Sequence, residues 1–474
     1  MRAVDWRGTM RRLEGADRYH LYVESAVQHQ HTLKVLVIDR DAATAPIDLG
    51  SVRGWAGAAA ARCPALRWRL HAVGTSAPVW VDDPMLDLDH HVGVVHVPAP
   101  GGRHELAATI ATVKELKLDR RRPLWRLWLV EGMGDGRVAL IWVFHHALAD
   151  GGETAKLLEQ LHGRGVPVGD PPLGLVPAGP VPTATATLVD GVGALARRVL
   201  DLPSLGARSI RAATAVRRRR RRGLSAPPRP VEAPATVFGQ GHTPHRAGAS
   251  ARVPMAAVAE VRRAFGVTVN DVFLATVSGA LASYLSSGGS SPRRSLTACV
   301  PVSIRADHEQ GALGNRLGTW FVTLGTDIDD PVARLAAVAR SARIARAARE
   351  ECRSTSLQQE WMEYTALFRG YIAIGNASTR RAGRSPYSVI ASNVRGPAPL
   401  VFAGAPVVEI QSYSQLAAGI GLNVTAWSYG DVLTAGLVAC PEHVPDLWDL
   451  ADRLAPALDE LVDAARTSAT ASVA

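Results

Sequence analysis

The chain has 474 residues, of which 47% are hydrophobic and 20% are charged. A single hydrophobic core is rarely built from a chain of this length, so two folded domains are expected. The length excludes a small disulfide scaffold, and the composition excludes a disordered chain. The formal net charge of +10 arises within residues 197–230, which hold eleven arginines and one acid, while the rest of the chain is neutral. The charge therefore indicates one basic segment on an otherwise neutral body.

The cysteines and the N-terminus bear on the compartment. Four cysteines lie far apart and form no CxxC or Cys/His spacing that holds a metal: Cys63, Cys299, Cys352 and Cys440. The first twenty residues lack the apolar core of a signal peptide, and no uncharged apolar run of about 18 residues occurs. We therefore expect a cytoplasmic protein that does not span a membrane.

In the N-terminal half, short apolar segments alternate with helical patterns. Residues 32–38 and 137–144 are rich in branched side chains, which predicts two buried strands. Pro and Gly cluster in residues 163–182 and 225–234, with the arginine run between these clusters. The predicted organisation is as follows: an N-terminal domain of residues 1–196, a basic linker of residues 197–245 and a C-terminal domain of residues 246–474.

The C-terminal half also mixes helices and strands. A helix is predicted over residues 255–265 and ends at Gly266, and Thr268 with Asp271 forms a capping-box pattern ahead of a longer helix. Further strands are predicted at residues 297–304, 317–326, 387–394, 406–413, 419–429 and 432–440. Gly430-Asp431 joins the last two strands as in a hairpin. The fold class is therefore α/β, with mixed sheets in both halves.

The segment HHALADG, residues 145–151, lies where the strand at 137–144 ends. A histidine at the mouth of a largely apolar site loses water, which keeps its imidazole neutral near pH 7 and able to accept a proton. Asp150 lies beyond the turn, where it could hold the loop by pairing with a cation. A tight turn explains Asp150 and Gly151, but it does not explain two adjacent histidines, so the sequence favours general-base chemistry.

HHxxxDG is the signature of the coenzyme A-dependent acyltransferase superfamily with the chloramphenicol acetyltransferase-like fold, which includes peptide-synthetase condensation domains. Over nearly its full length the chain resembles the bacterial wax ester synthase/diacylglycerol acyltransferase family. Besides HHALADG, the resemblance rests on PVWVDDPMLDLDHHV (78–92), LDRRRPLWRLWLVEG (118–132), GVTVNDVFLA (266–275), PVSIR (301–305), LGNRLG (313–318), SNVRGP (392–397) and GLNVTAWSYGDVLTAGLVA (421–439). Arg395 in SNVRGP stands where the family usually has proline.

The resemblance implies two chloramphenicol acetyltransferase-like domains with an active-site tunnel between them. It also implies transfer of a fatty acyl group from acyl-coenzyme A to the hydroxyl of diacylglycerol or of a long-chain alcohol. In this reaction His146 would be the general base, supported by His145. Asp150 would hold the loop, with Arg305 as a candidate partner, and Gly151 would allow close backbone approach to the substrate.

Asn270-Asp271 matches the second signature of the family, which would support the site from the C-terminal domain. A local explanation is also available, because Asp271 stands at the third helical position, where a cap contributes about 1 kcal/mol. The sequence favours the cap, and the supporting role stays open.

The basic segment predicts contact with lipid. Apolar residues recur at helical spacing before a proline at position 203 that should break the pattern: Leu188, Val192, Leu195, Val199 and Leu202. Six consecutive arginines follow at residues 217–222. Such a stretch suits an anionic membrane surface, where each cation contributes about 1 kcal/mol, and it predicts peripheral association with the inner membrane face or with lipid bodies. A solvated linker explains the same residues equally well.

Three other functions remain open from the sequence. A nucleic-acid binder is disfavoured because the arginine run contains no aromatic residues. A condensation-like or polyketide acyltransferase would use a carrier-protein donor. A lipid-binding relative without catalytic activity is disfavoured, because the HHALADG segment is intact. Because Walker A, GxGxxG and HExxH motifs are missing, neither metal nor cofactor is expected beyond acyl-coenzyme A as co-substrate. The oligomeric state and the choice between diacylglycerol and alcohol are undetermined.

Overall fold

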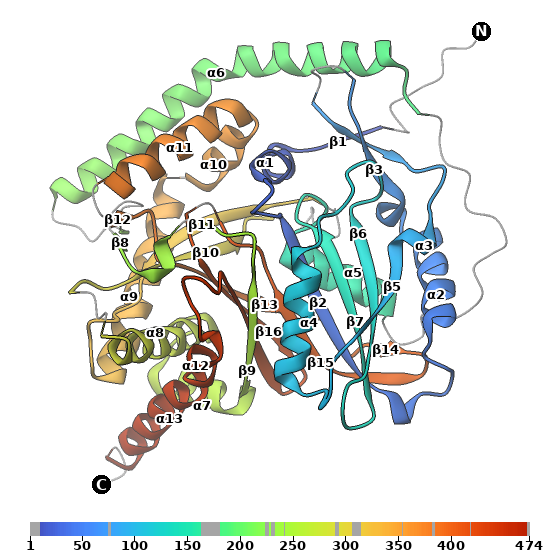
Figure 1. Cartoon of the computed structure of the whole chain (residues 1–474). Coiled ribbons are helices and arrows are strands. Elements are labelled where there is room, and N and C mark those ends of the chain that lie inside the picture. The colour runs from blue at the N-terminus through green and yellow to red at the C-terminus, as the bar shows by residue number, and fades with distance from the viewer. Residues whose placement is uncertain are drawn as a thin grey trace.

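The computed structural model describes residues 10–73, 77–162, 181–222, 227–228, 233–240, 242–289, 293–305, 314–352, 354–381, 384–417 and 419–471. Most of the Pro- and Gly-rich segments at 163–182 and 225–234 lies outside these residues. Two six-stranded mixed sheets lie side by side, each with its own helices (Figure 1). The helices used below are α1 (Gly15–Val23), α4 (Arg103–Glu115), α5 (Gly151–His162), α6 (Ala184–Arg221), α7 (Met255–Phe265), α8 (Val269–Ser287), α9 (Pro331–Cys352), α10 (Ser354–Met362), α11 (Thr365–Arg381), α12 (Leu447–Asp452) and α13 (Leu454–Ala471).

The first sheet contains both strands predicted in the N-terminal half. Its order is β14 (Val401–Phe402), β15 (Ala405–Tyr413), β2 (His31–Asp39), β7 (Arg137–His145), β6 (Trp125–Glu131) and β5 (Val92–His96). Almost every residue of β2 and β7 is buried, because these central strands are covered on both faces. Only β5 and β6 pair in parallel, so the sheet is mixed.

The second sheet has parallel pairs at its centre. Its order is β11 (Leu317–Thr323), β10 (Thr297–Ser303), β13 (Val389–Arg395), β16 (Leu422–Tyr429), β17 (Val432–Ala439) and β9 (Ala247–Pro254). As predicted, β16 and β17 form a hairpin across Gly430-Asp431. Helices α7, α8, α9, α12 and α13 gather on the outer side of this sheet, where their apolar residues form the second core (Figure 1).

The chain crosses between the halves late in the sequence. After β13 of the second sheet it enters β14 and β15, which extend the first sheet, and β15 pairs with β2 before the chain returns to the second sheet at β16. Helix α6 runs across residue 196, where the sequence placed a domain limit. Strands β14 and β15, from the predicted C-terminal domain, thus lie in the first sheet, and α6 crosses the predicted limit at residue 196. The domain limits stay a prediction.

Helix α6 continues through Pro203, so the expected break at this residue was wrong. A proline inside a helix costs about 3 kcal/mol because it removes one backbone hydrogen bond. Ion pairs on either side of the proline hold the helix against α10 and its neighbouring turn: Arg198 to Glu363, and Arg208 to Glu360. Figure 1 shows α6 along the outside of the molecule, next to α10 and α11.

No single helix in the described ranges is both long and apolar enough to cross a membrane. Helices α7 and α8 meet the requirement of length and composition only as a pair, with a bend of 105° between them. Most residues of α8 are buried in the core of the second half.

Candidate active site

A cavity of about 880 Å³ is lined by both halves of the chain. Its walls come from α1, β2, the HHALADG turn and α5 on one side and from β10, β11, β13, β16 and α10 with α11 on the other. Its lining residues include two histidines, a lysine, an aspartate, a glycine and an asparagine: His20, His146, Lys34, Asp150, Gly151 and Asn315. The HHALADG turn therefore opens into a cavity that both halves line, as the resemblance implied for the tunnel.

The HHALADG turn is held by the ends of neighbouring strands. The backbone N–H of His145 donates to the carbonyl of Leu124 at 3.0 Å, and that of His146 donates to the carbonyl of Gln30 at 2.7 Å. Ala149 then forms an isolated parallel bridge with Gly314. The turn is thus a rigid connection between the central strand of the first sheet and the start of α5.

The His146 imidazole is fixed in one tautomer by Asn315. Asn315 Nδ2 donates to Asp17 Oδ1 at 2.8 Å and to the carbonyl of His146 at 2.6 Å, so its Oδ1 is left as an acceptor. His146 Nδ1 lies 2.9 Å from this Oδ1 and must carry the proton. Burial, assisted by the charge of Lys34, lowers the pKa of His146 to about 4. The ring is therefore neutral at pH 7, and its Nε2 lone pair is available to a substrate.

Asn315 and Asp17 were not predicted from the sequence as site residues. Asn315 belongs to LGNRLG, which contributed to the resemblance, but no role followed from it. Asp17 Oδ1 accepts from both the backbone and the side chain of Asn315, and burial raises the pKa of Asp17 to about 6. The two residues are 298 positions apart, so nothing local in the sequence signals their contact.

His20 was also missed. Its ring stacks on that of His146, with the centroids 4.3 Å apart and the planes at 25°, and its Nδ1 lies 2.9 Å from Gln30 Oε1. Burial lowers the pKa of His20 well below its usual value, so this second imidazole is neutral too. This stacking restricts the orientation of the His146 ring.

His145 has a different environment from His146. Its Nδ1 accepts from the backbone N–H of Ala147 at 3.0 Å, so its Nε2 carries the proton and donates to Glu24 Oε2 at 3.2 Å. Although burial opposes ionisation, the hydrogen bond from His145 and the neighbouring Arg120 lower the pKa of Glu24 to about 2. His145 is not among the described residues that line the cavity. Its contacts anchor the turn, and its expected supporting role stays a prediction.

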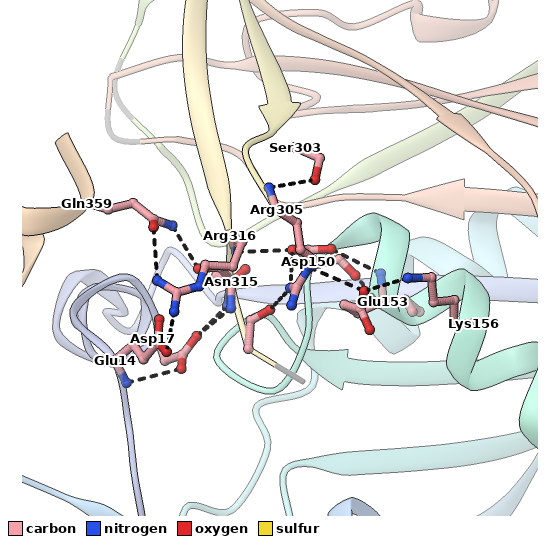
Figure 2. A network of polar contacts seen from close by, with 12 residues as sticks. Glu14, Asp17, Asp150, Glu153, Lys156, Ser303, Arg305, Asn315, Arg316 and Gln359 are labelled. Atoms are coloured by element: carbon pink, nitrogen blue, oxygen red, sulfur yellow. Dashed lines mark hydrogen bonds and ion pairs between the residues drawn. The ribbon is translucent and has the colours of Figure 1, made fainter. Parts of the chain in front are cut away.

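Asp150 joins the two halves, and the predicted pairing with Arg305 is present. Arg305 Nη2 donates to Asp150 Oδ2 at 3.1 Å, and the backbone N–H of Arg316 donates to the same oxygen at 3.1 Å (Figure 2). The other carboxylate oxygen accepts from the backbone N–H of Glu153 at 3.0 Å, in the first turn of α5. Arg305 Nε lies 3.3 Å from Glu153 Oε1. A single carboxylate therefore connects the turn, α5 and the second half.

The remaining predicted residues differ in their relation to the cavity. A Cβ at Gly151 would lie 3.1 Å from Val394 Cγ2, so the glycine lets α5 approach β13 closely at the cavity wall. Asp271 Oδ2 accepts from the backbone N–H of Thr268 at 2.9 Å, and Thr268 Oγ1 accepts from the backbone N–H of Asp271 at 3.2 Å, which together form the predicted capping box. Neither Asn270 nor Asp271 is among the described residues that line the cavity. Within the described ranges, no three His, Cys, Asp or Glu side chains gather in a way that could hold a metal ion.

Family models match most of the chain. The wax ester synthase/diacylglycerol acyltransferase catalytic domain matches residues 13–273, and the WS/DGAT C-terminal domain matches residues 313–462. The chain belongs to the wax ester synthase/diacylglycerol acyltransferase family. The resemblance inferred from the sequence motifs is thereby confirmed.

Relatives in Mycobacterium tuberculosis support this membership. A protein of strain H37Rv, named provisionally as a diacylglycerol O-acyltransferase, is 33% identical and covers 97% of this chain and 99% of its own length. A second H37Rv protein with the same provisional name is 32% identical, over 96% of this chain and 90% of its own. The wax ester synthase/diacylglycerol acyltransferase family therefore includes full-length relatives of this chain.

Solved structures confirm the fold class. The wax ester synthase/diacylglycerol acyltransferase from Marinobacter aquaeolei VT8 has a TM-score of 0.67 and 24% identity over 96% of this chain and 99% of its own. The first condensation domain of the CDA synthetase has a TM-score of 0.59 and 15% identity over 96% of each chain. A variant starter condensation domain of rhizomide synthetase, in complex with C8-CoA, has a TM-score of 0.52 and 12% identity over 92% of this chain and 90% of its own. At these identities the likeness is one of fold.

Proposed function

We propose that the protein transfers a long-chain acyl group from acyl-coenzyme A to the hydroxyl of diacylglycerol, and that it also accepts long-chain alcohols. The observation that carries this proposal is the neutral His146 in the wall of the shared cavity, with its Nδ1 proton held by Asn315. The provisional names of the mycobacterial relatives and the C8-CoA bound by a structural neighbour support the acceptor and the donor.

The proposed reaction uses His146 as a general base. The acceptor hydroxyl donates its proton to Nε2 while its oxygen attacks the thioester carbon, and the carbonyl electron pair moves to oxygen. When the tetrahedral intermediate collapses, the C–S bond breaks and the coenzyme A thiolate takes the proton from His146. Apolar cavity residues on β11 and α11 are suited to the acyl chain: Leu317, Phe321, Phe368 and Ile372.

The experiment that tests the proposal is thiol release from palmitoyl-coenzyme A, with dioleoylglycerol and hexadecanol offered in parallel. We expect acceptor-dependent release that disappears in His146→Ala. Thiol release that does not depend on either acceptor, or that persists in a folded His146→Ala variant, contradicts the proposal. Activity only with a carrier-protein thioester as donor would instead favour the condensation-like reaction.

We further propose that the enzyme works at an anionic lipid surface and docks through α6. Six apolar residues of this helix are between 59% and 78% exposed: Val189, Val192, Leu195, Val199, Leu200 and Ile210. The arginines at 217–221 follow on the same helix, so apolar area and positive charge occur together.

Docking through α6 is tested by sedimentation with vesicles of phosphatidylglycerol or of phosphatidylcholine. We expect binding to the anionic vesicles that decreases with salt and with Val192→Ser and Val199→Ser together. Salt-sensitive binding to DNA without binding to vesicles would contradict docking and favour a nucleic-acid partner.

A further inference from the structure

Lys34 is a buried lysine in the cavity wall that the reaction described so far does not use. It lies on β2 and is 2% exposed. Its Nζ donates to Thr32 Oγ1 at 2.9 Å and to Ser412 Oγ at 2.6 Å. No ion pair joins Lys34 to a carboxylate among the described residues. A buried ammonium without a counter-ion is costly, because desolvation is not repaid by an opposite charge.

The surroundings of Lys34 leave hydrogen-bond donors without an acceptor. An ammonium has three N–H donors, of which two are used by the hydroxyls of Thr32 and Ser412. Nζ lies 4.6 Å from the centre of the Trp427 ring, which lines the same cavity. The buried Trp427 Nε1 has no hydrogen-bond partner in the described part of the chain. Among the described residues, this part of the wall therefore has donors and positive charge but no anion paired with Lys34.

Lys34 extends toward His146. Its ammonium bonds to Thr32, two residues nearer the end of β2 where Gln30 accepts from the backbone of His146. Lys34, Thr32 and His146 all line the same cavity. The charge of Lys34 contributes to lowering the pKa of His146, so the two groups interact electrostatically.

We propose that Lys34 stabilises the oxyanion of acyl transfer: its ammonium pairs with the negatively charged oxygen that forms when the acceptor attacks the thioester. This inference rests on the proposed function. The carbonyl electron pair moves to oxygen during attack and returns when the C–S bond breaks, so the step requires no proton transfer to or from Lys34. Because the negative charge exists only in the transition states and the intermediate, a fixed cation there lowers the barrier rather than tightening ground-state binding.

Two properties of Lys34 fit this role. Burial lowers the pKa of Lys34 to about 7, and a negative charge that develops nearby favours the protonated form. The proposed acceptors, diacylglycerol and a fatty alcohol, bring no anion of their own to the cavity. The oxyanion is thus the counter-ion that the proposed chemistry itself supplies.

The chain offers a matched control in a second buried lysine. Lys114 is 5% exposed, and its Nζ donates to the backbone carbonyls of His31 at 3.0 Å and Tyr413 at 3.4 Å. Lys114 is not among the described residues that line the cavity. Replacing either lysine by methionine keeps the apolar stem and removes one buried charge.

The test compares Lys34→Met with Lys114→Met by kcat, by KM for palmitoyl-coenzyme A and dioleoylglycerol, and by the midpoint of thermal unfolding. We expect Lys34→Met to lower kcat by about 10²- to 10³-fold with both KM values within about threefold, and with the unfolding midpoint unchanged or higher. Lys114→Met should keep kcat within about threefold. Added ethylammonium should partly restore the turnover of Lys34→Ala but not that of His146→Ala.

Three results would overturn the role of Lys34. These are a kcat of Lys34→Met equal to that of the wild type, a loss that follows the unfolded fraction, and an effect confined to the KM of the acceptor, which would indicate recognition of the acceptor instead. Turnover in the wild type that is absent in His146→Ala keeps the proposed function whatever Lys34 does. A wild-type enzyme inactive with both acceptors would overturn both.

Discussion

Asp150 and Asp271 each accept a hydrogen bond in the first turn of a helix, yet they connect different parts of the molecule. The contacts of Asp271 are with Thr268, three residues away. One oxygen of Asp150 accepts from the backbone N–H of Glu153, three residues later in α5, but its other oxygen accepts from Arg305 and from the backbone of Arg316 in the second half. Asp271 thus secures one helix, whereas Asp150 also holds the HHALADG turn against the second half.

The largest effect is expected from His146→Ala. Loss of the proposed general base should lower kcat by about 10²- to 10⁴-fold, while circular dichroism stays that of the wild type. Steady-state kinetics with palmitoyl-coenzyme A measures the change. If a folded variant keeps normal turnover, the HHALADG turn has no role as a base and the contrast with Asp271 disappears.

Asn315→Ala should lower kcat by about 10²-fold, because the imidazole loses the acceptor that keeps its proton on Nδ1 and its ring in place. KM for acyl-coenzyme A should change little, since Asn315 contacts the base rather than the thioester in this mechanism. A change in KM alone would instead make Asn315 a substrate-binding residue. Asp17→Asn should lower kcat less than Asn315→Ala does, because Asp17 acts on His146 through Asn315.

Asp150→Asn and Arg305→Met test the connection between the halves. Each substitution removes one member of a buried ion pair, which costs about 3–5 kcal/mol of stability. The double variant should be less damaging than the sum of the two, with a coupling free energy of about 1 kcal/mol or more from chemical denaturation. Strict additivity would mean that the 3.1 Å contact contributes nothing in solution.

The histidines in the first half predict a dependence of stability on pH. Burial lowers the pKa of His146 and of His91 to about 4 and that of His162 to about 3, whereas an unfolded histidine has a pKa of about 6.5. As pH falls below about 6.5, the unfolded chain binds protons that the folded chain does not, so stability falls by up to about 1.4 kcal/mol per pH unit for each histidine. Asp17 opposes this trend, because burial raises its pKa to about 6.

Unfolding midpoints measured between pH 7.5 and 4.5 check this prediction. His162→Gln should flatten the curve without changing the cavity, since His162 is not among the described residues that line it. A midpoint that does not fall as the pH is lowered would contradict the neutral state assigned to these rings.

The smallest effect is expected from Asp271→Ala. Loss of the cap should lower the free energy of unfolding by about 1 kcal/mol and leave kcat unchanged. Denaturant titration and kinetics of the same preparation measure both quantities. A clear fall in kcat would restore the supporting role that the family resemblance implied for Asn270-Asp271, and it would end the contrast with Asp150.

Local features could be predicted from the sequence, and long-range contacts could not. The hairpin at Gly430-Asp431, the cap at Asp271 and the turn after β7 depend on neighbouring residues, so composition and spacing indicate them. The partners of the two histidines lie far along the chain: Asn315 is 169 residues from His146, and Glu24 is 121 residues from His145. The pairing of Asp150 with Arg305 was predicted only because HHALADG and PVSIR both contributed to the family resemblance.

The exchange of β15 into the first sheet has a consequence for synthesis of the protein. Strand β2 is made early, but its neighbour β15 spans residues 405–413, so the first sheet lacks this strand until most of the chain has left the ribosome. During that interval one edge of an apolar strand is open to wrong partners. The nascent chain therefore needs protection for the time that it takes to translate several hundred codons, and a fragment that ends before residue 405 would keep this edge exposed.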